Sequence, residues 1–140
     1  MTQADRPGGR TGLNHVAIAV RDLDAAVAYY QDILGLPCSH RERVADQAVD
    51  VALFGDGQGR IELICPFTPD SGVAKFLAKR GEGLHHLCLD VPDLEATLAA
   101  MKARGIPLLD EEPRTGAGGS RIAFVHPKGA LGVLLELRQA

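Results

Sequence analysis

Residues 14–36 read NHVAIAVRDLDAAVAYYQDILGL, and residues 85–106 read HHLCLDVPDLEATLAAMKARGI. At a constant offset of 71 positions, the two stretches match at His15/His86, Val20/Val91, Asp22/Asp93, Leu23/Leu94 and Ala25/Ala96. Each stretch begins with an apolar segment of strand length, passes an Asp suited to cap a helix N-terminus, and continues in a helical pattern. Gly35 and Gly105 can end the two helices. The repeat therefore predicts two copies of one unit, a strand followed by a helix.

The segments after each predicted helix are short, apolar or alternating, and separated by Gly, Pro and charged residues, which is typical of strands joined by turns. We expect strands over 38–44, 48–54 and 60–65 in the first copy, and over 107–112, 121–126 and 131–138 in the second. Each copy is then a βαβββ unit. The fold class predicted from these elements is α+β.

A further helix is predicted over 70–81, between the copies, because Ser71 can cap it and apolar residues follow at helical spacing. The repeats are expected at 13–66 and 84–139 within a single domain, 12–140, and residues 1–11 are expected to form a flexible N-terminus. A chain of 140 residues has room for one such domain.

The composition predicts a soluble globular protein, with 46% hydrophobic residues and a net charge of −3. This charge offers no general attraction to nucleic acid or to an anionic membrane surface. The apolar runs are far shorter than the ~20 residues that a membrane helix needs, so a cytoplasmic protein is expected. Cys38, Cys65 and Cys88 are odd in number and widely spaced, which favours reduced thiols in the core.

Strand alternation separates the side chains of the two matching strands into two faces. Bulky residues fall on one face, namely Val16, Ile18 and Val20 in the first copy and Leu87, Leu89 and Val91 in the second; the other face carries His15, Ala17 and Ala19, or His86, Cys88 and Asp90. The bulky face suits packing against a helix. The small residues beside each histidine would leave room for a ligand.

The last strand of each copy carries a carboxylate among aliphatic residues, Glu62 in the first and Glu136 in the second. A buried ionised carboxylate is costly unless it is paired or bound to a metal. Pairing of the copies would bring His15, Glu62, His86 and Glu136 towards one centre. Two imidazoles with two carboxylates suit Co, Mn, Ni, Fe or Zn, and suit Ca poorly. The alternative is a pair of structural histidines with two edge carboxylates.

Four segments, LNHVAIAV, DSGVAKFL, GLHHLCLDV and GAGGSRIAFVHPKGALGVLLEL, closely resemble the methylmalonyl-CoA epimerase family, a branch of the vicinal-oxygen-chelate (glyoxalase-like) superfamily, over residues 12–140. The resemblance implies a curved mixed sheet around a metal site. It implies a divalent ion, Co²⁺ first, with Mn²⁺, Ni²⁺ or Zn²⁺ as alternatives. The implied ligands are His15, Glu62, His86 and Glu136, and His85 becomes a structural neighbour.

The activity that the resemblance implies is interconversion of (2R)- and (2S)-methylmalonyl-CoA by 1,1-proton transfer through an enolate. A metal acts on such an enolate as a Lewis acid, and inversion needs a base on one face and an acid on the other. Glu136 is the candidate for one of these groups. The family's second glutamate aligns with Val51. The nearby polar residues in VADQAVDV are Asp46, Gln47 and Asp50. Asp50 would need a register shift to replace the glutamate.

The implied partner is a small acyl-CoA, with methylmalonyl-CoA or a related 2-substituted malonyl-CoA as the substrate. Lys128 and Arg121 are the candidate contacts to its phosphates, and Lys75 is also available. Each is alternatively a solvated surface charge. A homodimer is expected, with neither nucleic acid nor membrane as a partner.

Three other functions compete with an epimerase. A lactoylglutathione lyase of the glyoxalase I type has a similar His/Glu metal centre and also moves a proton. An extradiol oxygenase would use two His and one carboxylate, and Glu62 as a fourth ligand argues against it. A metal-free small-molecule binding protein of the superfamily would not require both His and both Glu.

Overall fold

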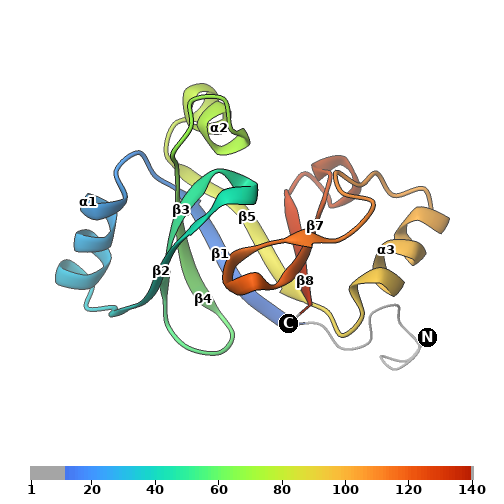
Figure 1. Ribbon diagram of the computed structural model, residues 1–140, viewed down its shortest axis with the longest axis horizontal. Helices are drawn as coiled ribbons and strands as arrows, with labels where there is room; N and C mark the ends of the chain where they lie inside the picture. The colour runs from blue at the N-terminus through green and yellow to red at the C-terminus, as the bar shows by residue number, and fades with distance from the viewer. Residues whose placement is uncertain (1–11, 140) are drawn as a thin grey trace. The chain divides into compact units, whose positions relative to one another are not determined.

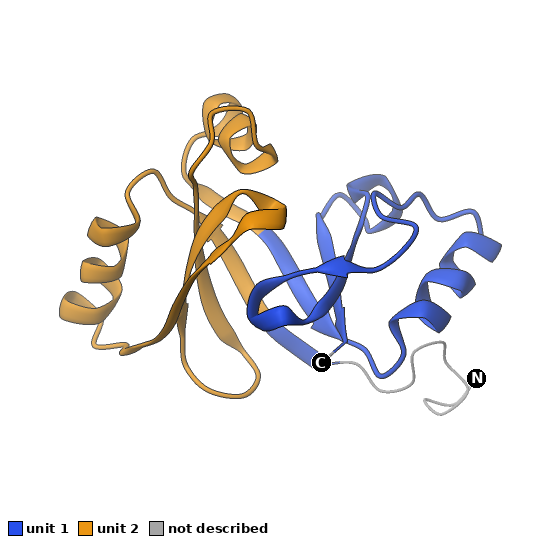
Figure 2. Cartoon of the chain, in the orientation of Figure 1, with its two compact units in different colours: residues 1–14, 86–140 blue, residues 15–85 orange. Residues whose placement is uncertain are grey.

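The computed structural model describes residues 12–139 and divides into two compact units (Figure 2). Unit 1 consists of residues 1–14 and 86–140, and unit 2 of residues 15–85. Each unit contains a run of one strand, one helix and then three strands in chain order, and unit 2 also contains the connecting helix. The predicted βαβββ pattern is therefore confirmed. The flexible N-terminus predicted over 1–11 lies outside the described residues.

Unit 2 holds the first strand–helix copy and the connecting helix. Its elements are β1 (Gly12–Ala19, with 15–19 in this unit), α1 (Leu23–Ala28), the π-helical turn η2 (Tyr29–Ile33), β2 (Cys38–Val44), the 3-10 turn η3 (Ala45–Gln47), β3 (Val49–Phe54), β4 (Arg60–Pro66) and α2 (Gly72–Arg80). The strands lie in the order β2-β3-β4-β1. The β1/β4 pair is parallel, whereas β2/β3 and β3/β4 are antiparallel, so the sheet is mixed, as predicted.

Helix α1 covers one face of these strands (Figure 1). Asp22 caps the helix, since its carboxylate accepts a hydrogen bond of 3.0 Å from the backbone N–H of Ala25. A buried cluster beneath the helix consists of Val20, Val27, Ala52, Phe54 and Leu63, with Ile18 packed against it. The bulky face of β1 therefore packs against a helix, as the alternation predicted.

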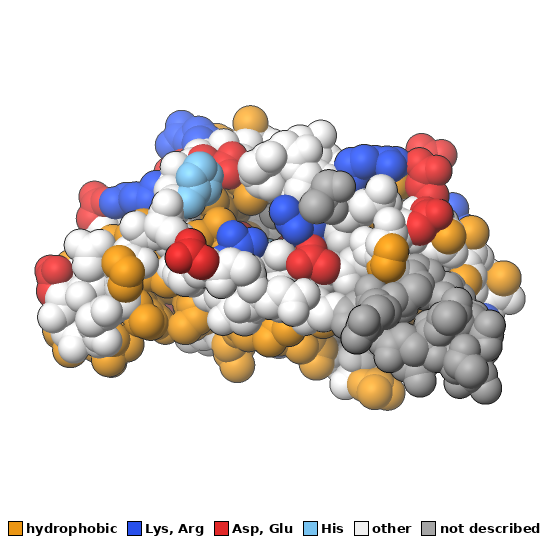
Figure 3. Space-filling model, turned by 90° about the horizontal axis from the view of Figure 1, so that it is seen from below, with side chains coloured by type: hydrophobic (Ala, Val, Ile, Leu, Met, Phe, Trp, Pro, Cys, Tyr) orange, Lys and Arg blue, Asp and Glu red, His pale blue; other side chains and the backbone are white. Residues whose placement is uncertain are grey.

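Helix α1 passes into η2, and the segment ends at Gly35 with a φ of 74°, as predicted for a helix terminus. Several apolar side chains of this segment are exposed: Tyr29, Ile33, Leu34 and Leu36. Figure 3 shows hydrophobic side chains gathered at the lower left of the view, over this end of unit 2. Unit 2 thus carries an apolar surface beside α1.

The connecting helix α2 runs over Gly72–Arg80, close to the predicted 70–81. The hydroxyl of Ser71 accepts a hydrogen bond of 3.1 Å from the N–H of Ala74, which confirms the predicted cap. No helix among residues 12–139 is long and apolar enough to cross a membrane.

Unit 1 holds the second copy. Its elements are β5 (Gly83–Asp90, with 86–90 in this unit), α3 (Leu94–Ala103), β6 (Arg114–Thr115), the 3-10 turn η4 (Ala117–Gly119), β7 (Arg121–Val125), the 3-10 turn η5 (Pro127–Gly129) and β8 (Leu135–Gln139). The strands lie in the order β5-β8-β7-β6, with β5/β8 parallel. A buried cluster at α3 consists of Val91, Leu94, Leu98, Ala123, Val125 and Leu137.

One predicted strand of the second copy is wrong, and another begins later than predicted. Residues 107–112 form no strand, and only Leu108 makes an isolated bridge, to Val125. The N–H groups of Leu109 and Asp110 both donate to the carbonyl of Phe124. The N–H of Phe124 donates instead to the Asp110 carboxylate, at 2.9 Å, so a regular backbone ladder does not form. The strand predicted over 131–138 begins only at Leu135, because the preceding residues fold back in turns, with the N–H of Gly132 bonded to the carbonyl of Pro127 at 2.8 Å.

The cysteines are free thiols, as predicted. Cys88 is fully buried, and Cys38 and Cys65 pack against the α1 cluster. Burial raises the pKa of the Cys65 thiol above its ordinary value. Cys65 is therefore not expected to act as a reactive thiolate at neutral pH.

Ala48 adopts the left-handed conformation, with φ 56° and ψ 41°, immediately after η3. This conformation strains a residue with a Cβ atom and is freely adopted by Gly. Ala48→Gly should therefore raise the free energy of unfolding by about 1 kcal/mol, measured by urea denaturation. Ala45→Gly, inside the right-handed η3 turn, is the matched control and should lower it. Equal effects of the two substitutions would refute strain at Ala48.

Candidate metal centre

In unit 2, His15 and Glu62 form a buried pair. Each is 5% exposed, and His15 Nε2 lies 3.5 Å from Glu62 Oε1. His15 is carried by β1 and Glu62 by β4, which pair in parallel with Ala17 opposite Glu62. The alternation that buries Leu63 under α1 directs Glu62 to the other face, where His15 and Ala17 also lie.

In unit 1, His86 and Glu136 form the equivalent pair. They are 4% and 5% exposed, and His86 Nε2 lies 3.2 Å from Glu136 Oε1. The ring of Phe124 meets the His86 ring edge to face, with centroids 5.5 Å apart. Phe124 lies directly opposite Glu136 in the β7/β8 pair. Phe124 therefore shares the face of these strands and orients the imidazole by packing.

A small, fully buried side chain stands beside each carboxylate. Ala17 is the β1 partner of Glu62, and Cys88 is the β5 partner of Glu136. Each is two residues beyond its histidine, so the histidine, the small residue and the carboxylate have the same arrangement in both units. The predicted face of small side chains beside the histidines is therefore present twice.

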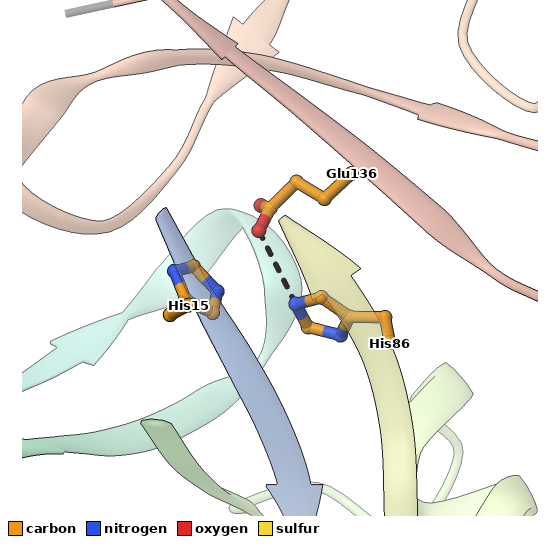
Figure 4. Close-up of side chains that lie close together, drawn as sticks. All are labelled: His15, His86 and Glu136. Atoms are coloured by element: carbon orange, nitrogen blue, oxygen red, sulfur yellow. Dashed lines mark hydrogen bonds and ion pairs between the residues drawn. The ribbon is translucent and has the colours of Figure 1, made fainter. Parts of the chain in front are cut away.

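Three of the four predicted ligands form one close group, His15, His86 and Glu136 (Figure 4). Each offers one ligand atom, and these atoms all lie within 4.8 Å of one another. Glu62 is not in this group, although it contacts His15. The close-up shows the imidazole of His86 pointing towards the carboxylate of Glu136.

The donor set fits a divalent first-row metal. Imidazole nitrogen and carboxylate oxygen bind Zn²⁺ at about 2.0–2.2 Å, so two donors on one ion lie at most about 4.4 Å apart. Donors in a tetrahedral site lie closer, about 3.4 Å apart, so the three side chains would have to draw together by about 1 Å to bind one ion. All three groups are buried, and a buried carboxylate gains most from a cation nearby. The group can therefore hold a metal ion.

The other residues singled out in the sequence lie elsewhere. The guanidinium of Arg121 contacts the carboxylate of Glu95 on α3 at 2.5 Å, and its side chain is on the face of β7 opposite to Phe124. Lys128 is exposed on the turn η5, where its backbone N–H donates to Nδ1 of His126 at 3.0 Å. Position 51, where the family's second glutamate aligns, is a buried valine and offers no carboxylate.

Comparison with known proteins places this arrangement in a family. The model of the Glyoxalase/Bleomycin resistance protein/Dioxygenase superfamily matches residues 14–124. The human mitochondrial methylmalonyl-CoA epimerase is 42% identical over 129 residues, which cover 91% of this chain and 73% of the human protein. The chain belongs to the methylmalonyl-CoA epimerase family.

Solved structures of epimerases share the fold. The methylmalonyl-CoA epimerase of Mycobacterium tuberculosis is 43% identical, with a TM-score of 0.86, over 91% of this chain and 87% of that chain. A methylmalonyl-CoA epimerase in complex with methylmalonyl-CoA and NH4+ is 39% identical, with a TM-score of 0.88, over 93% of this chain and 94% of that chain. The predicted vicinal-oxygen-chelate fold is confirmed by these likenesses.

The competing lyase is less similar. A probable lactoylglutathione lyase of Vibrio cholerae is 28% identical over 90% of this chain, compared with 42% for the human epimerase. Since both belong to one superfamily, identity over nearly the same length favours the epimerase family. The comparisons also favour an enzyme over a metal-free binding protein.

Sequence reasoning missed two contributors to these strands. Phe124 was not singled out, although its position opposite Glu136 follows once β7 and β8 are paired. Glu42 was also missed, although HRER, 40–43, has the alternation of a strand. Pairing of β2 with β3 places Glu42 opposite Val51. The sequence contained the alternation but no signal for the pairing.

Proposed function

We propose that this chain interconverts the 2R and 2S epimers of methylmalonyl-CoA by proton transfer at the α-carbon. The observation that carries the proposal is the buried group of His15, His86 and Glu136 in a chain that is 42% identical to a methylmalonyl-CoA epimerase. Glu62 is proposed as a fourth metal ligand through its contact with His15. A bound divalent ion, Co²⁺ first and otherwise Mn²⁺, Ni²⁺ or Zn²⁺, would supply Lewis-acid stabilisation of the enolate.

The protein groups have separate tasks in this reaction. Glu136 is proposed to move the α-proton with its carboxylate, since it is buried and lies beside His86. Phe124 holds the His86 ring at a fixed angle by edge-to-face contact. Ala17 and Cys88 are small and fully buried, so they add little bulk beside the carboxylates. Burial of these groups excludes water, which strengthens each electrostatic interaction in the site.

The direct test is proton NMR of single epimers of methylmalonyl-CoA in D2O. The purified protein should catalyse both loss of the α-proton signal and appearance of the other epimer, faster than an enzyme-free sample. A glutathione hemithioacetal offered to the same protein should not be turned over. The proposal fails if the wild-type protein, loaded with Co²⁺, produces neither exchange nor epimer conversion.

Lys128 is proposed to contact a phosphate of CoA from the exposed turn η5. Lys128→Ala should raise KM for the CoA ester several-fold with little change in kcat, because an exposed phosphate contact contributes to binding alone. Lys75→Ala, which removes a lysine of α2, is a matched comparison, and steady-state kinetics measure both. An unchanged KM for Lys128→Ala would return this lysine to a solvated surface charge. Arg121 is a weaker candidate because its guanidinium is engaged by Glu95.

The oligomeric state, the cellular location and the absence of other partners are also proposals. A homodimer is proposed, and the exposed apolar residues beside α1 are consistent with burial of surface between subunits; light scattering gives the mass directly. A cytoplasmic location is proposed from the composition. No interaction with nucleic acid or membranes is proposed, given the net charge of −3.

A further inference from the structure

The face of unit 1 that carries Glu136 also carries an arginine, Arg138. In β8, Leu137 belongs to the buried cluster at α3, and the side-chain carbonyl of Gln139 accepts a hydrogen bond of 2.7 Å from the backbone at the start of α3. These two side chains point towards α3, so alternation directs Glu136 and Arg138 to the opposite face. Two residues along a strand span about 6.7 Å. The long arginine side chain can therefore reach a ligand bound beside Glu136.

The register of unit 1 gives the neighbours of Arg138 on this face. Asp90 of β5 is its partner in the parallel pair, and Ile122 of β7 is its partner in the antiparallel pair. One row earlier, Phe124 of β7 lies opposite Glu136. Ile122 is 1% exposed and apolar, so Asp90 is the polar neighbour of Arg138 in this row.

A hydrogen-bonded chain of three side chains holds Arg138 in place. Its Nη1 donates a hydrogen bond of 2.7 Å to Oδ1 of Asp90, and Oδ2 of Asp90 accepts one of 2.9 Å from Nδ2 of Asn14. Asn14 is 3% exposed, so it anchors Asp90 from inside the protein. A guanidinium has five N–H donors, and the contact with Asp90 uses one of them. The Arg138 side chain is 25% exposed, so it is restrained and still open to a ligand.

Arginine and lysine are rare on this face. Among the described strand residues of unit 1, register and alternation place only Arg138 and Arg114 on the face of Glu136. Arg114 pairs with Asp110 at 3.4 Å and lies opposite Ile122 on the edge strand β6. That position is two strands from β8, about 12 Å from Glu136 at Cα. Arg138 is therefore the nearer of the two cations.

The proposed substrate brings a negative charge to this face. A 2-substituted malonyl-CoA carries a carboxylate on the carbon that exchanges its proton, and the proposed reaction places that carbon beside Glu136. The carboxylates of Glu136 and Asp90 would both repel it, and such repulsion is strong where water is scarce. A guanidinium binds a carboxylate through parallel N–H donors. Arg138 is next to both repelling groups and supplies the compensating charge.

We propose that Arg138 binds the free carboxylate of the malonyl group, with Asp90 as its positioning residue. This contact selects 2-carboxyacyl thioesters over simple acyl thioesters. The inference rests on the proposed epimerisation, which brings the α-carbon to Glu136. The contact consists of charge-assisted hydrogen bonds, so no covalent bond changes at Arg138. Propionyl-CoA, which lacks the carboxylate, would gain nothing from it.

The test is equilibrium binding of three thioesters to the Co²⁺-loaded protein, measured by isothermal titration calorimetry. Methylmalonyl-CoA and malonyl-CoA carry the carboxylate, and propionyl-CoA does not. Arg138→Gln should raise Kd for the first two about tenfold and leave Kd for propionyl-CoA unchanged. Arg138→Lys, which keeps the charge without the planar fork, should fall between. Arg43→Gln, which removes an arginine paired with Asp50 in unit 2, is the control and should bind all three as the wild type does.

Removal of Arg138 also leaves the charge of Asp90 without its partner, and that charge alone would repel a carboxylate. The double variant Asp90→Asn/Arg138→Gln separates the two causes because it removes both charges. Its Kd for methylmalonyl-CoA should stay as high as that of Arg138→Gln. Recovery of the wild-type Kd would overturn the direct contact, since the single variant would then have acted through Asp90.

Other outcomes separate this proposal from the proposed function. An unchanged Kd for methylmalonyl-CoA in Arg138→Gln, at equal Co²⁺ content, would overturn the role of Arg138. An equal rise in Kd for propionyl-CoA would overturn it as well, because the arginine would then contact the CoA portion that all three thioesters share. Both results leave the epimerase intact if the wild type exchanges the α-proton. A wild type that neither exchanges nor inverts methylmalonyl-CoA would instead refute the epimerase.

Discussion

Glu136→Gln is expected to lower kcat/KM for epimerisation by about a thousand-fold or more, because the proposed proton-transfer group and a proposed charged metal ligand are lost together. Gln has the size of Glu and can still accept a hydrogen bond from His86, which lies 3.2 Å from the carboxylate. The fold should therefore persist. Epimer conversion measures the rate, and circular dichroism measures the fold.

Glu95→Gln is the matched control for this change. Glu95 is an exposed carboxylate in the same unit, in contact with Arg121. Exposed ion pairs of this kind contribute only about 0–1 kcal/mol, so its removal should leave kcat/KM unchanged. A Glu136→Gln protein that turned over at a near wild-type rate would refute both proposed roles of Glu136.

Removal of metal is expected to lower the melting temperature as well as the activity. A metal present at about 100 times its Kd stabilises the folded state by about 2.7 kcal/mol, which corresponds to roughly 10 °C in a domain of this size. The physical reason is the burial of Glu62 and Glu136, both 5% exposed, whose charges a divalent ion would balance. Differential scanning fluorimetry of chelator-treated protein, before and after addition of Co²⁺, measures the difference.

His86→Ala distinguishes specific binding from a general effect of the ion. This variant lacks a ligand of the His15, His86 and Glu136 group, so Co²⁺ should no longer raise its melting temperature, and turnover should be abolished. Glu95→Gln should respond to Co²⁺ as the wild type does. If chelation left the wild-type melting temperature unchanged and Co²⁺ stabilised every variant alike, the metal centre would be rejected.

Local patterns in the sequence predicted most of the fold. The repeat of strand and helix, the caps at Asp22, Asp93 and Ser71, and the two-residue alternation each depend on neighbours in the chain. Such patterns can be recognised without knowledge of distant contacts. The strand predicted over 107–112 was wrong because the structure of this segment depends on a distant contact. The side chain of Asp110 accepts a hydrogen bond from the N–H of Phe124, 14 residues later. No local pattern in the sequence predicts that contact.

For the candidate site, the sequence by itself predicted His15, Glu62, His86 and Glu136, because a polar side chain in a buried strand is costly unless it is paired or bound and the repeat places these residues at equivalent positions. Only the tertiary structure decided which of them lie together and which further side chains share their face. Glu42 joins that face through its pairing with Val51 on the neighbouring strand. Alternation assigns a residue to one of two faces, but the register between strands, which sets its neighbours, arises from packing across the sheet.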